Sequence, residues 1–257
     1  MTSKFLSRRR LLTAGAVGVG ALALGGLNRF LIAPNYLQIL ESAEGLTLRA
    51  QRAMLAGQPL AREFSEADLS PIFKANGTVL PDTAACEALM ANDFADWRLT
   101  IDGMVTTPAS LSMADLKRLP QRTQITRHDC VEGWSAIGKW TGVPLGPLLQ
   151  TAGLAPNARF VVFHCADDLG GGANGLYYES VDLVDAFHPQ TILAHTMNDA
   201  PLKVAHGAPL RLRVERQLGY KHAKYLMRIE VVESLANIGR GNGGFWEDRG
   251  YEWYAGI

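Results

Sequence analysis

The sequence predicts an α+β protein that is mainly β, a single domain with short helices around mixed sheets. Three observations lead to this fold class. From residue 97 onward, apolar and polar residues alternate with the period of two that is typical of strands. The helical stretches between them are short and do not alternate regularly with strands, as they would in a doubly wound parallel sheet. A chain of 257 residues with 47% hydrophobic side chains is also long enough to bury a full core.

Residues 1–33 are predicted to be a twin-arginine signal or anchor. Three arginines, Arg8 to Arg10, precede an apolar run at 11–27. Adjacent arginines before such a run are typical of the twin-arginine route, which exports folded proteins and suits those that need a cofactor inserted first. The run is close to the shortest that spans a bilayer and no small-x-small cleavage site follows, so a membrane anchor at 11–27 remains an alternative. The sequence therefore predicts an exported, periplasmic protein.

The charge distribution argues against nucleic-acid binding. The formal net charge is zero, with 25 basic and 25 acidic residues, but residues 1–40 hold five basic residues and no acidic one. The rest of the chain is therefore acidic on balance, whereas a nucleic-acid-binding domain carries a basic patch.

The elements follow in order along the chain. Residues 34–68 are predicted to be a helical lead-in, with the helix at 36–57. Residues 69–83 have no periodicity and contain two prolines, so we expect an extended loop that lies over another part of the domain. The main domain is predicted at 69–257. Its first strand starts at Trp97, and Asp102-Gly103 is a hairpin signal.

The remaining elements alternate between strands and short helices. Ser112 is a good N-cap for a helix that ends near residue 119. The further strands are predicted at 122–129, 158–167, 191–197, 208–215 and 223–232, and the further helices at 143–153 and 181–187.

The three cysteines do not form a disulfide framework, because an odd number leaves at least one unpaired. A single bridge from Cys165 to either Cys86 or Cys130 is compatible with the sequence. Cys130 stands out because it ends a predicted strand, where the chain turns into V-E-G-W-S. It could be an inert buried cysteine, a nucleophile with His128 as its base, or a ligand of a soft metal.

A second constellation lies in residues 206–226. Four residues can donate to a phosphate, and Gly207 and Gly219 let backbone amides approach an anion closely. The constellation consists of His206, Arg211, Lys221, His222 and Lys224, which lie within nineteen residues. A solvated basic edge strand is the alternative, but such a strand does not need two glycines. The pattern favours a site for a buried, phosphorylated cofactor.

These motifs, in this order, resemble the sulfite oxidase family of molybdopterin-dependent oxidoreductases. The matching stretches are C-V-E-G-W-S, W-T-G-V-P-L, H-G-A-P-L-R and G-Y-K-H-A-K, and the resemblance covers about residues 69–232. Within the family the chain is most similar to bacterial periplasmic members such as the methionine sulfoxide reductase catalytic subunit. The resemblance implies the sulfite oxidase fold and a molybdenum-molybdopterin cofactor (Moco).

The resemblance also implies roles for particular residues. Cys130 is expected to be the catalytic residue and the protein thiolate on molybdenum, while the pterin brings the other sulfur ligands. The expected cofactor-binding residues are Asn76, Cys165, Asp167, His206, Arg211, His222, Ala223 and Lys224. Among these, Arg211, His222 and Lys224 are expected to anchor the phosphate. Arg127 and Lys139 are nearby cations that could receive an anionic substrate.

The resemblance implies oxygen-atom or two-electron transfer on a small-molecule substrate such as a sulfoxide or a sulfite-like anion. No C-x-x-C-H haem motif is present, so electrons are expected to pass through a separate partner, a membrane cytochrome b or a c-type cytochrome. Two alternatives remain: a non-catalytic binding protein of the same fold, and a thiol hydrolase that uses Cys130 and His128. The aromatic tail at 242–257 is expected either to pack on the domain or to form a docking surface for the electron partner.

Overall fold

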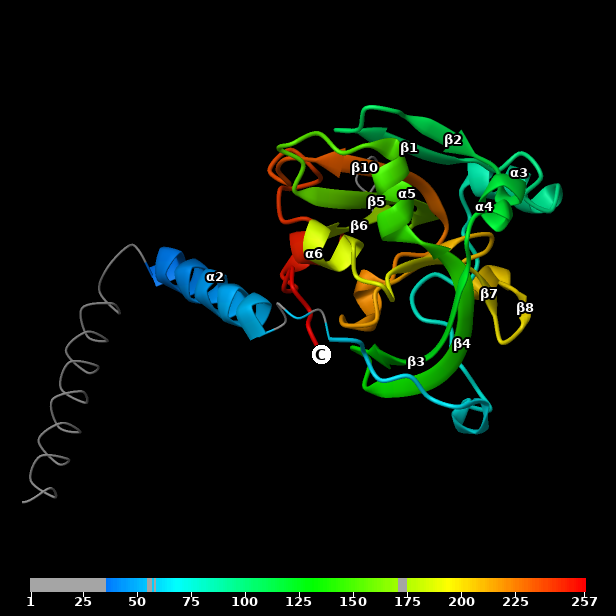
Figure 1. Ribbon diagram of the computed structural model, residues 1–257, viewed down its shortest axis with the longest axis horizontal. Helices are drawn as coiled ribbons and strands as arrows, with labels where there is room; N and C mark the ends of the chain where they lie inside the picture. Colours follow the sequence, from blue (N-terminus) through cyan, green and yellow to red (C-terminus); the bar gives the residue numbers. More distant parts are fainter. Residues whose placement is uncertain (1–35, 55–56, 58, 171–174) are drawn as a thin grey trace, which may run out of the picture. The chain divides into compact units, whose positions relative to one another are not determined.

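The computed structural model describes residues 36–54, 57, 59–170 and 175–257 (Figure 1). The predicted signal or anchor lies outside the described residues. The chain divides into two compact units, residues 1–59 and 60–257. The first contains helix α2 (Tyr36–Met54), which lies within the predicted helix at 36–57. Within the described ranges, no helix is both long and apolar enough to cross a membrane.

The second unit is built on two sheets, each of five strands in the described part of the chain. The first sheet has the order β2-β1-β10-β5-β6, and only the β1–β10 pair is parallel. Its strands are β1 (Leu99–Gly103), β2 (Ala109–Leu111), β5 (Phe160–Asp168), β6 (Leu176–Asp182) and β10 (Leu226–Val232). The second has the order β3-β4-β7-β8, with β9 also paired to β7. Its strands are β3 (Arg122–Cys130), β4 (Trp134–Pro144), β7 (Ile192–Met197), β8 (Ala200–Pro201) and β9 (Arg211–Arg213).

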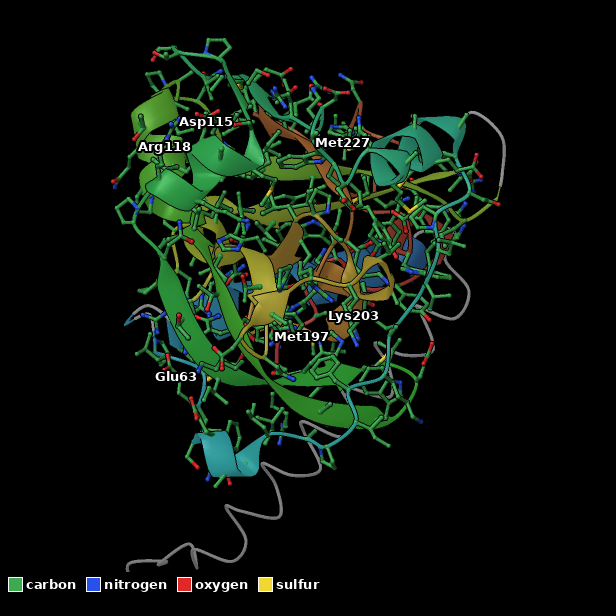
Figure 2. The ribbon with its side chains drawn as sticks, turned by 90° about the vertical axis from the view of Figure 1, so that its right-hand side faces the viewer. Glu63, Asp115, Arg118, Met197, Lys203 and Met227 are labelled. Carbon is green, nitrogen blue, oxygen red and sulfur yellow. The ribbon has the colours of Figure 1, made fainter. Side chains whose placement is uncertain are left out.

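The helices of this unit are short, as predicted. The α-helices are α3 (Ala84–Ala91), α4 (Met113–Arg118), α5 (Leu145–Ala152) and α6 (Leu183–Ala186). The 3-10 turns are η1 (Glu66–Asp68), η3 (Val204–His206), η4 (Gly219–Lys221) and η5 (Glu247–Arg249). Ser112 caps α4 in a reciprocal capping box with Asp115, labelled with Arg118 in Figure 2. The mixed, mainly β architecture confirms the predicted fold class.

Two local predictions needed correction. The segment at 134–144, for which no strand was predicted, is the eleven-residue strand β4 (Trp134–Pro144). Its glycines lower the strand propensity, but a side chain at Gly142 would meet the backbone of Leu193 at 2.1 Å, so close strand pairing requires glycine there. Asp102-Gly103 is not a tight hairpin turn either. Strands β1 and β2 do pair, but Ile101 lies opposite Ala109, so a longer loop connects them.

The predicted extended loop at 69–83 has neither helix nor strand and does lie over the domain. The Ser70 amide donates to the Ile137 carbonyl of β4 at 3.0 Å, and the Thr78 carbonyl accepts from Lys224 and from the Tyr225 hydroxyl. Just before it, Glu63 forms a bridge with Thr126 of β3, so this segment runs along the second sheet (Figure 2). The loop thereby closes one side of the cavity described next.

Candidate active site

Cys130 is placed by a tight hairpin between β3 and β4. Val131, Glu132 and Gly133 form the turn, and the Gly133 amide donates to the Cys130 carbonyl at 3.0 Å. Gly133 has φ +83°, the left-handed conformation that a three-residue hairpin favours and glycine adopts without strain. The motif C-V-E-G-W thus fixes the thiol at the end of a rigid strand. Burial raises the pKa of the Cys130 thiol.

Cys130 lines a cavity of about 180 Å³. Five segments that are distant in the sequence contribute to its lining: the β3–β4 hairpin, the loop at 69–83, the β5–β6 region, the turn around η4 and the C-terminal tail. Its residues are Asn76, Gly77, Thr78, Cys130, Val131, Glu132, Asp167, Leu169, Tyr177, Gly219, Tyr220, His222, Lys224, Trp246 and Tyr251. The structure therefore brings five of the predicted site residues together: Cys130, Asn76, Asp167, His222 and Lys224.

Two buried cations lie at this site without a carboxylate partner among the described residues. Arg211 is fully buried and donates to the carbonyls of His206 at 3.0 Å and His222 at 3.3 Å, but its Nε has no partner. Burial and the nearby Arg213 lower the pKa of Arg211 to about 9. Lys224 donates to the Ala205 carbonyl at 3.0 Å and to that of Thr78. Burial, together with Arg211, lowers the pKa of Lys224 to about 7.

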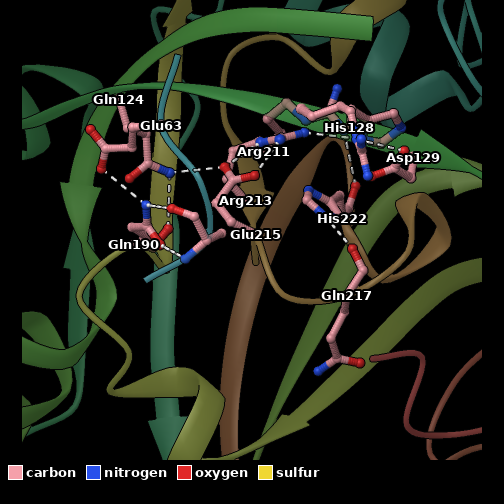
Figure 3. Close-up of polar contacts among 12 residues, drawn as sticks. Glu63, Gln124, His128, Asp129, Gln190, Arg211, Arg213, Glu215, Gln217 and His222 are labelled. Carbon is pink, nitrogen blue, oxygen red and sulfur yellow. Dashed lines mark hydrogen bonds and ion pairs between the residues drawn. The ribbon is translucent and has the colours of Figure 1, made fainter. Parts of the chain in front are cut away.

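Two histidines of the site each present an unpartnered nitrogen (Figure 3). His222 donates from Nε2 to the Gln217 carbonyl at 3.0 Å, which leaves Nδ1 as an unused acceptor. His128 accepts at Nδ1 from Arg213 at 3.0 Å, which leaves Nε2 as an unused donor. Burial, followed by the charge of Arg213, lowers the pKa of both imidazoles well below the usual value.

The unpartnered polar atoms test whether a cofactor fits. Buried polar groups are normally satisfied, so a cluster of unsatisfied ones indicates a missing partner. Near the cavity they are Thr78 Oγ1, His128 Nε2, Asp167 Oδ1, His206 Nδ1, Arg211 Nε and His222 Nδ1. A phosphorylated heterocycle with donors and acceptors on its edges would supply both the missing hydrogen bonds and the negative charge. The residues present therefore fit a molybdopterin.

Gly207 and Gly219 were expected to let backbone amides approach an anion, and the structure shows a further reason for glycine at both positions. A side chain at Gly207, which has φ +101°, would approach Lys224 Cβ at 2.9 Å and Arg211 Cβ at 3.3 Å. A side chain at Gly219 would approach His128 Nε2 at 2.5 Å. Both glycines make room for the anchoring side chains, in addition to any contact of their amides with an anion.

Four predicted site residues do not line this cavity. His206 lines a second hollow with Phe73, Met197 and Lys203, and burial lowers its pKa to about 4. Arg211 is not among the lining residues, although it donates to the carbonyl of the lining residue His222. Cys165 and Ala223 belong to the main hydrophobic core. The cofactor roles of these four, and of the five residues that line the cavity, stay predictions. The three cysteines are free, so neither candidate disulfide bridge forms.

The two cations expected to receive an anionic substrate are not at the cavity. Arg127 lies on the exposed face of β3 and pairs with Asp129 at 2.9 Å. Lys139 pairs with Glu66 at 2.7 Å and Asp199 at 2.9 Å. Strand alternation explains the first case, because His128 faces inward and its neighbour Arg127 must therefore face outward.

The geometry also argues against a thiol hydrolase. A general base must accept the thiol proton, but the accepting nitrogen of His128 is already occupied by the Arg213 guanidinium. Arg213 is itself held by Glu215 through two hydrogen bonds, of 2.9 and 2.6 Å, and all three side chains are buried. His128 therefore lacks a free acceptor for the Cys130 proton.

Sequence reasoning missed the outer part of the cavity. Trp246 and Tyr251 come from the tail, Tyr177 comes from the unpredicted strand β6, and Glu132 lies inside the cysteine motif. The signals that could have indicated them are the five aromatic residues in 242–257 and the carboxylate two positions after Cys130. The tail does pack on the domain, because Phe245 is buried and the Leu218 amide donates to the Ala255 carbonyl at 2.9 Å.

The site belongs to the class that holds a metal through a cofactor. Across the described ranges, no group of three or more His, Cys, Asp or Glu residues could bind a metal ion alone. A lone cysteine, which binds a metal as its thiolate, beside a lining of unpaired polar atoms and a buried cation suits a metal whose other ligands come from an anionic cofactor.

The comparisons with known proteins name the family. The family described as "Oxidoreductase molybdopterin binding domain" matches residues 87–237, more than half of the chain. The chain belongs to this family, and its cofactor is molybdopterin-bound molybdenum.

Two curated relatives and one solved structure illustrate the similarity. YedZ1 from Azospira oryzae is 42% identical over 164 residues, which cover 64% of this chain and 57% of that protein. The protein-methionine-sulfoxide reductase catalytic subunit MsrP from Xanthomonas campestris is 36% identical over 147 residues, 54% of this chain and 46% of that protein. The chain thus spans about half the length of these relatives. The sulfane dehydrogenase SoxCD from Paracoccus pantotrophus aligns with a TM-score of 0.49 and 25% identity over 55% of this chain and 39% of that chain.

Proposed function

We propose that this chain is an exported molybdenum oxidoreductase that reduces sulfoxides. One observation carries the proposal: Cys130 lines a cavity together with the buried Lys224, Arg211 contacts the lining residue His222, and neither cation has a carboxylate partner among the described residues. The similarity to a protein-methionine-sulfoxide reductase catalytic subunit supports a sulfoxide as the substrate. The separation of Arg127 and Lys139 from the cavity makes a sulfite-like anion less suitable.

The overall reaction consumes one sulfoxide, two electrons and two protons, and releases one thioether and one water. The bound cofactor supplies the oxygen-atom and two-electron chemistry. The chain holds and tunes this cofactor. Cys130 provides the thiolate ligand of the metal. Arg211 and Lys224 neutralise the phosphate, and because both side chains are already buried in the folded protein, they do not have to be desolvated when the phosphate binds.

The remaining anchors lie around the two basic residues. Asn76 and the Thr78 carbonyl belong to the loop at 69–83, which Lys224 ties to the η4 region. Asp167, His206 and His222 offer the unsatisfied polar atoms that a pterin edge requires. Ala223 contributes through its backbone, and Cys165 supports the end of β5 from the core side.

The electrons come from a separate partner in this proposal, a membrane cytochrome b or a periplasmic c-type cytochrome. The protein reaches the periplasm by the twin-arginine route through residues 1–33, either free or anchored by residues 11–27. The arginine-flanked apolar run supports the route, because folded export allows the cofactor to be inserted beforehand.

The decisive experiment measures metal and activity together. The full-length protein is exported from a host supplied with molybdate, and molybdenum is quantified by mass spectrometry. The expected result is about one molybdenum per chain and sulfoxide reduction with reduced viologen as the electron donor. Folded protein without molybdenum, from a host that loads a known molybdoenzyme, would refute the assignment and favour a non-catalytic binding protein. Molybdenum without sulfoxide reduction would refute only the substrate.

A further inference from the structure

We propose that Trp246, Tyr251 and Glu132 form a specificity wall that admits neutral sulfoxides and rejects anionic ones. The inference rests on the proposed sulfoxide reduction and concerns the same cavity. All three residues line the cavity together with Cys130. They come from two places, the C-terminal tail and the β3–β4 hairpin.

The aromatic part of the wall is an ordered surface. The rings of Trp246 and Tyr251 lie 5.3 Å apart with an interplanar angle of 30°, and Tyr251 also packs edge-on against Tyr220 at 5.2 Å. Phe245, which is buried in the core, packs edge-on against Trp246 at 5.4 Å. Tyr251 keeps 41% of its surface exposed, so it is available to a ligand that enters from solvent.

Buried polar contacts fasten the tail that carries these rings. Lys221 is fully buried and pairs with Glu179 of β6 and with Glu247, which directly follows Trp246. The Tyr220 hydroxyl donates to the Glu252 carbonyl at 2.6 Å, next to Tyr251. These bonds hold the two rings on either side of a short turn. The wall is therefore preorganised rather than formed by a loose chain end.

The position of the tail in the sequence points to a selective role. The family match ends at residue 237, whereas both aromatic residues lie beyond it. The anchoring residues Arg211, His222 and Lys224 all lie inside the match. The family region thus supplies the cofactor anchors, and the tail adds a separate surface to the same cavity.

The charges at the wall favour a neutral substrate. Glu132 is exposed and accepts a hydrogen bond from Trp134 Nε1 at 2.9 Å, which keeps its carboxylate at the hairpin. Lys224, the one lysine or arginine among the described lining residues, is buried, donates to two carbonyls and, in the proposed function, neutralises the cofactor phosphate. An anionic substrate would meet this carboxylate without a compensating charge, whereas the thioether end of a neutral sulfoxide can pack against the aromatic rings.

The test uses a matched pair of substrates on the molybdenum-loaded enzyme: N-acetylmethionine sulfoxide as its neutral amide and as its free carboxylate. We expect the wild type to prefer the amide in kcat/KM. Trp246→Ala and Tyr251→Ala should each raise KM for the amide by up to about tenfold, and Trp246→Phe should restore most of the loss. Glu132→Gln should lower the amide preference by at least about threefold, whereas Glu233→Gln, an exposed carboxylate away from the cavity, should not.

A second readout does not depend on turnover. Binding of the unreactive N-acetylmethionine sulfone amide is measured by calorimetry, and molybdenum content is measured for every variant. Weaker sulfone binding in Trp246→Ala at unchanged molybdenum content supports the wall. Unchanged sulfone binding and KM in both alanine variants, or a wild-type preference for the carboxylate, would overturn it. A loaded wild type that binds the sulfone at the wall but reduces no sulfoxide would instead refute the proposed function.

Discussion

The inner and outer walls of the cavity beside Cys130 differ in the kind of side chain that they present. The inner wall is formed by His222 and Lys224, with Arg211 bonded to the His222 carbonyl, and is buried and polar. Neither cation has a carboxylate partner among the described residues, and His222 Nδ1 and Arg211 Nε have no hydrogen-bond partner. The outer wall, Glu132, Trp246 and Tyr251, is partly exposed and aromatic, with one carboxylate. An uncompensated buried cation is costly unless a ligand neutralises it, so the inner wall is suited to a permanent anionic cofactor. The outer wall needs no ligand to be stable and is suited to a transient substrate.

The largest effect is expected from removing the two inner cations. Arg211→Ala combined with Lys224→Ala should reduce molybdenum from about one per chain to almost none, because the phosphate loses both charged partners. Mass spectrometry of the purified variant gives the metal content. Circular dichroism confirms that the variant is folded. Full molybdenum content in this double variant would show that the inner wall does not anchor the cofactor.

The variant Cys130→Ser should lose catalytic activity without losing the cofactor. Activity should fall to background because the thiolate is lost, while pterin is largely retained through Arg211 and Lys224. Fluorescence of the released, oxidised pterin measures cofactor content independently of turnover. Loss of both pterin and activity would mean that Cys130 is needed to retain the cofactor as well.

The stability of the packed C-terminal tail should depend strongly on the buried side chain of Lys221. Lys221→Met leaves Glu179 and Glu247 buried without their shared cation, which should lower the free energy of unfolding by about 3–5 kcal/mol. Urea unfolding of wild type and variant measures the difference. The combined variant Lys221→Met, Glu179→Leu and Glu247→Leu should recover much of the stability, because no unpaired charge remains. An equal loss in both variants would contradict this account.

The inner wall should also make the cofactor-free protein sensitive to pH. The folded-state pKa of Lys224 is about 7, below its usual 10.5, so between these values the unfolded chain binds more protons. The free energy of unfolding should therefore rise with pH from 7 to 8.5, by up to about 1.4 kcal/mol per pH unit. In the loaded protein the phosphate keeps Lys224 protonated and this slope should vanish. Urea titrations of both forms across the range test the difference, and equal slopes would argue against a phosphate at Lys224.

The smallest effect is expected from the cations outside both walls. Arg127→Ala and Lys139→Ala should leave molybdenum content and kcat/KM for a neutral sulfoxide unchanged, since each residue only pairs with surface carboxylates. Steady-state kinetics of the loaded variants tests this. A large loss of molybdenum content or of kcat/KM in either variant would mean that the substituted residue does contribute to the active site.

The sequence determined the features that depend on local pattern. Period-two alternation located β1 and β3, and further strand-like stretches located β5, β7, β9 and β10. Ser112 located the start of α4, and the order of the cysteine and basic motifs indicated the family. Cys130, Asn76, Asp167, His222 and Lys224 were all predicted and do share one cavity. These predictions succeeded because strand periodicity, capping and motif spacing are properties of neighbouring residues.

Only the tertiary structure decided which distant residues meet. Glu66 and Asp199 neutralise Lys139 from 73 and 60 residues away, and no local pattern reveals such a pairing. Strand β4 contains glycines that lower its strand propensity. It forms nevertheless, because it pairs with β3 on one side and with β7 on the other. The tail reaches the cavity because the buried Lys221 fastens it to β6. The sequence alone thus indicated the family and the residues predicted to anchor its cofactor. Contacts between remote segments decided the charge and shape of the entrance, because those contacts are fixed only when the chain packs.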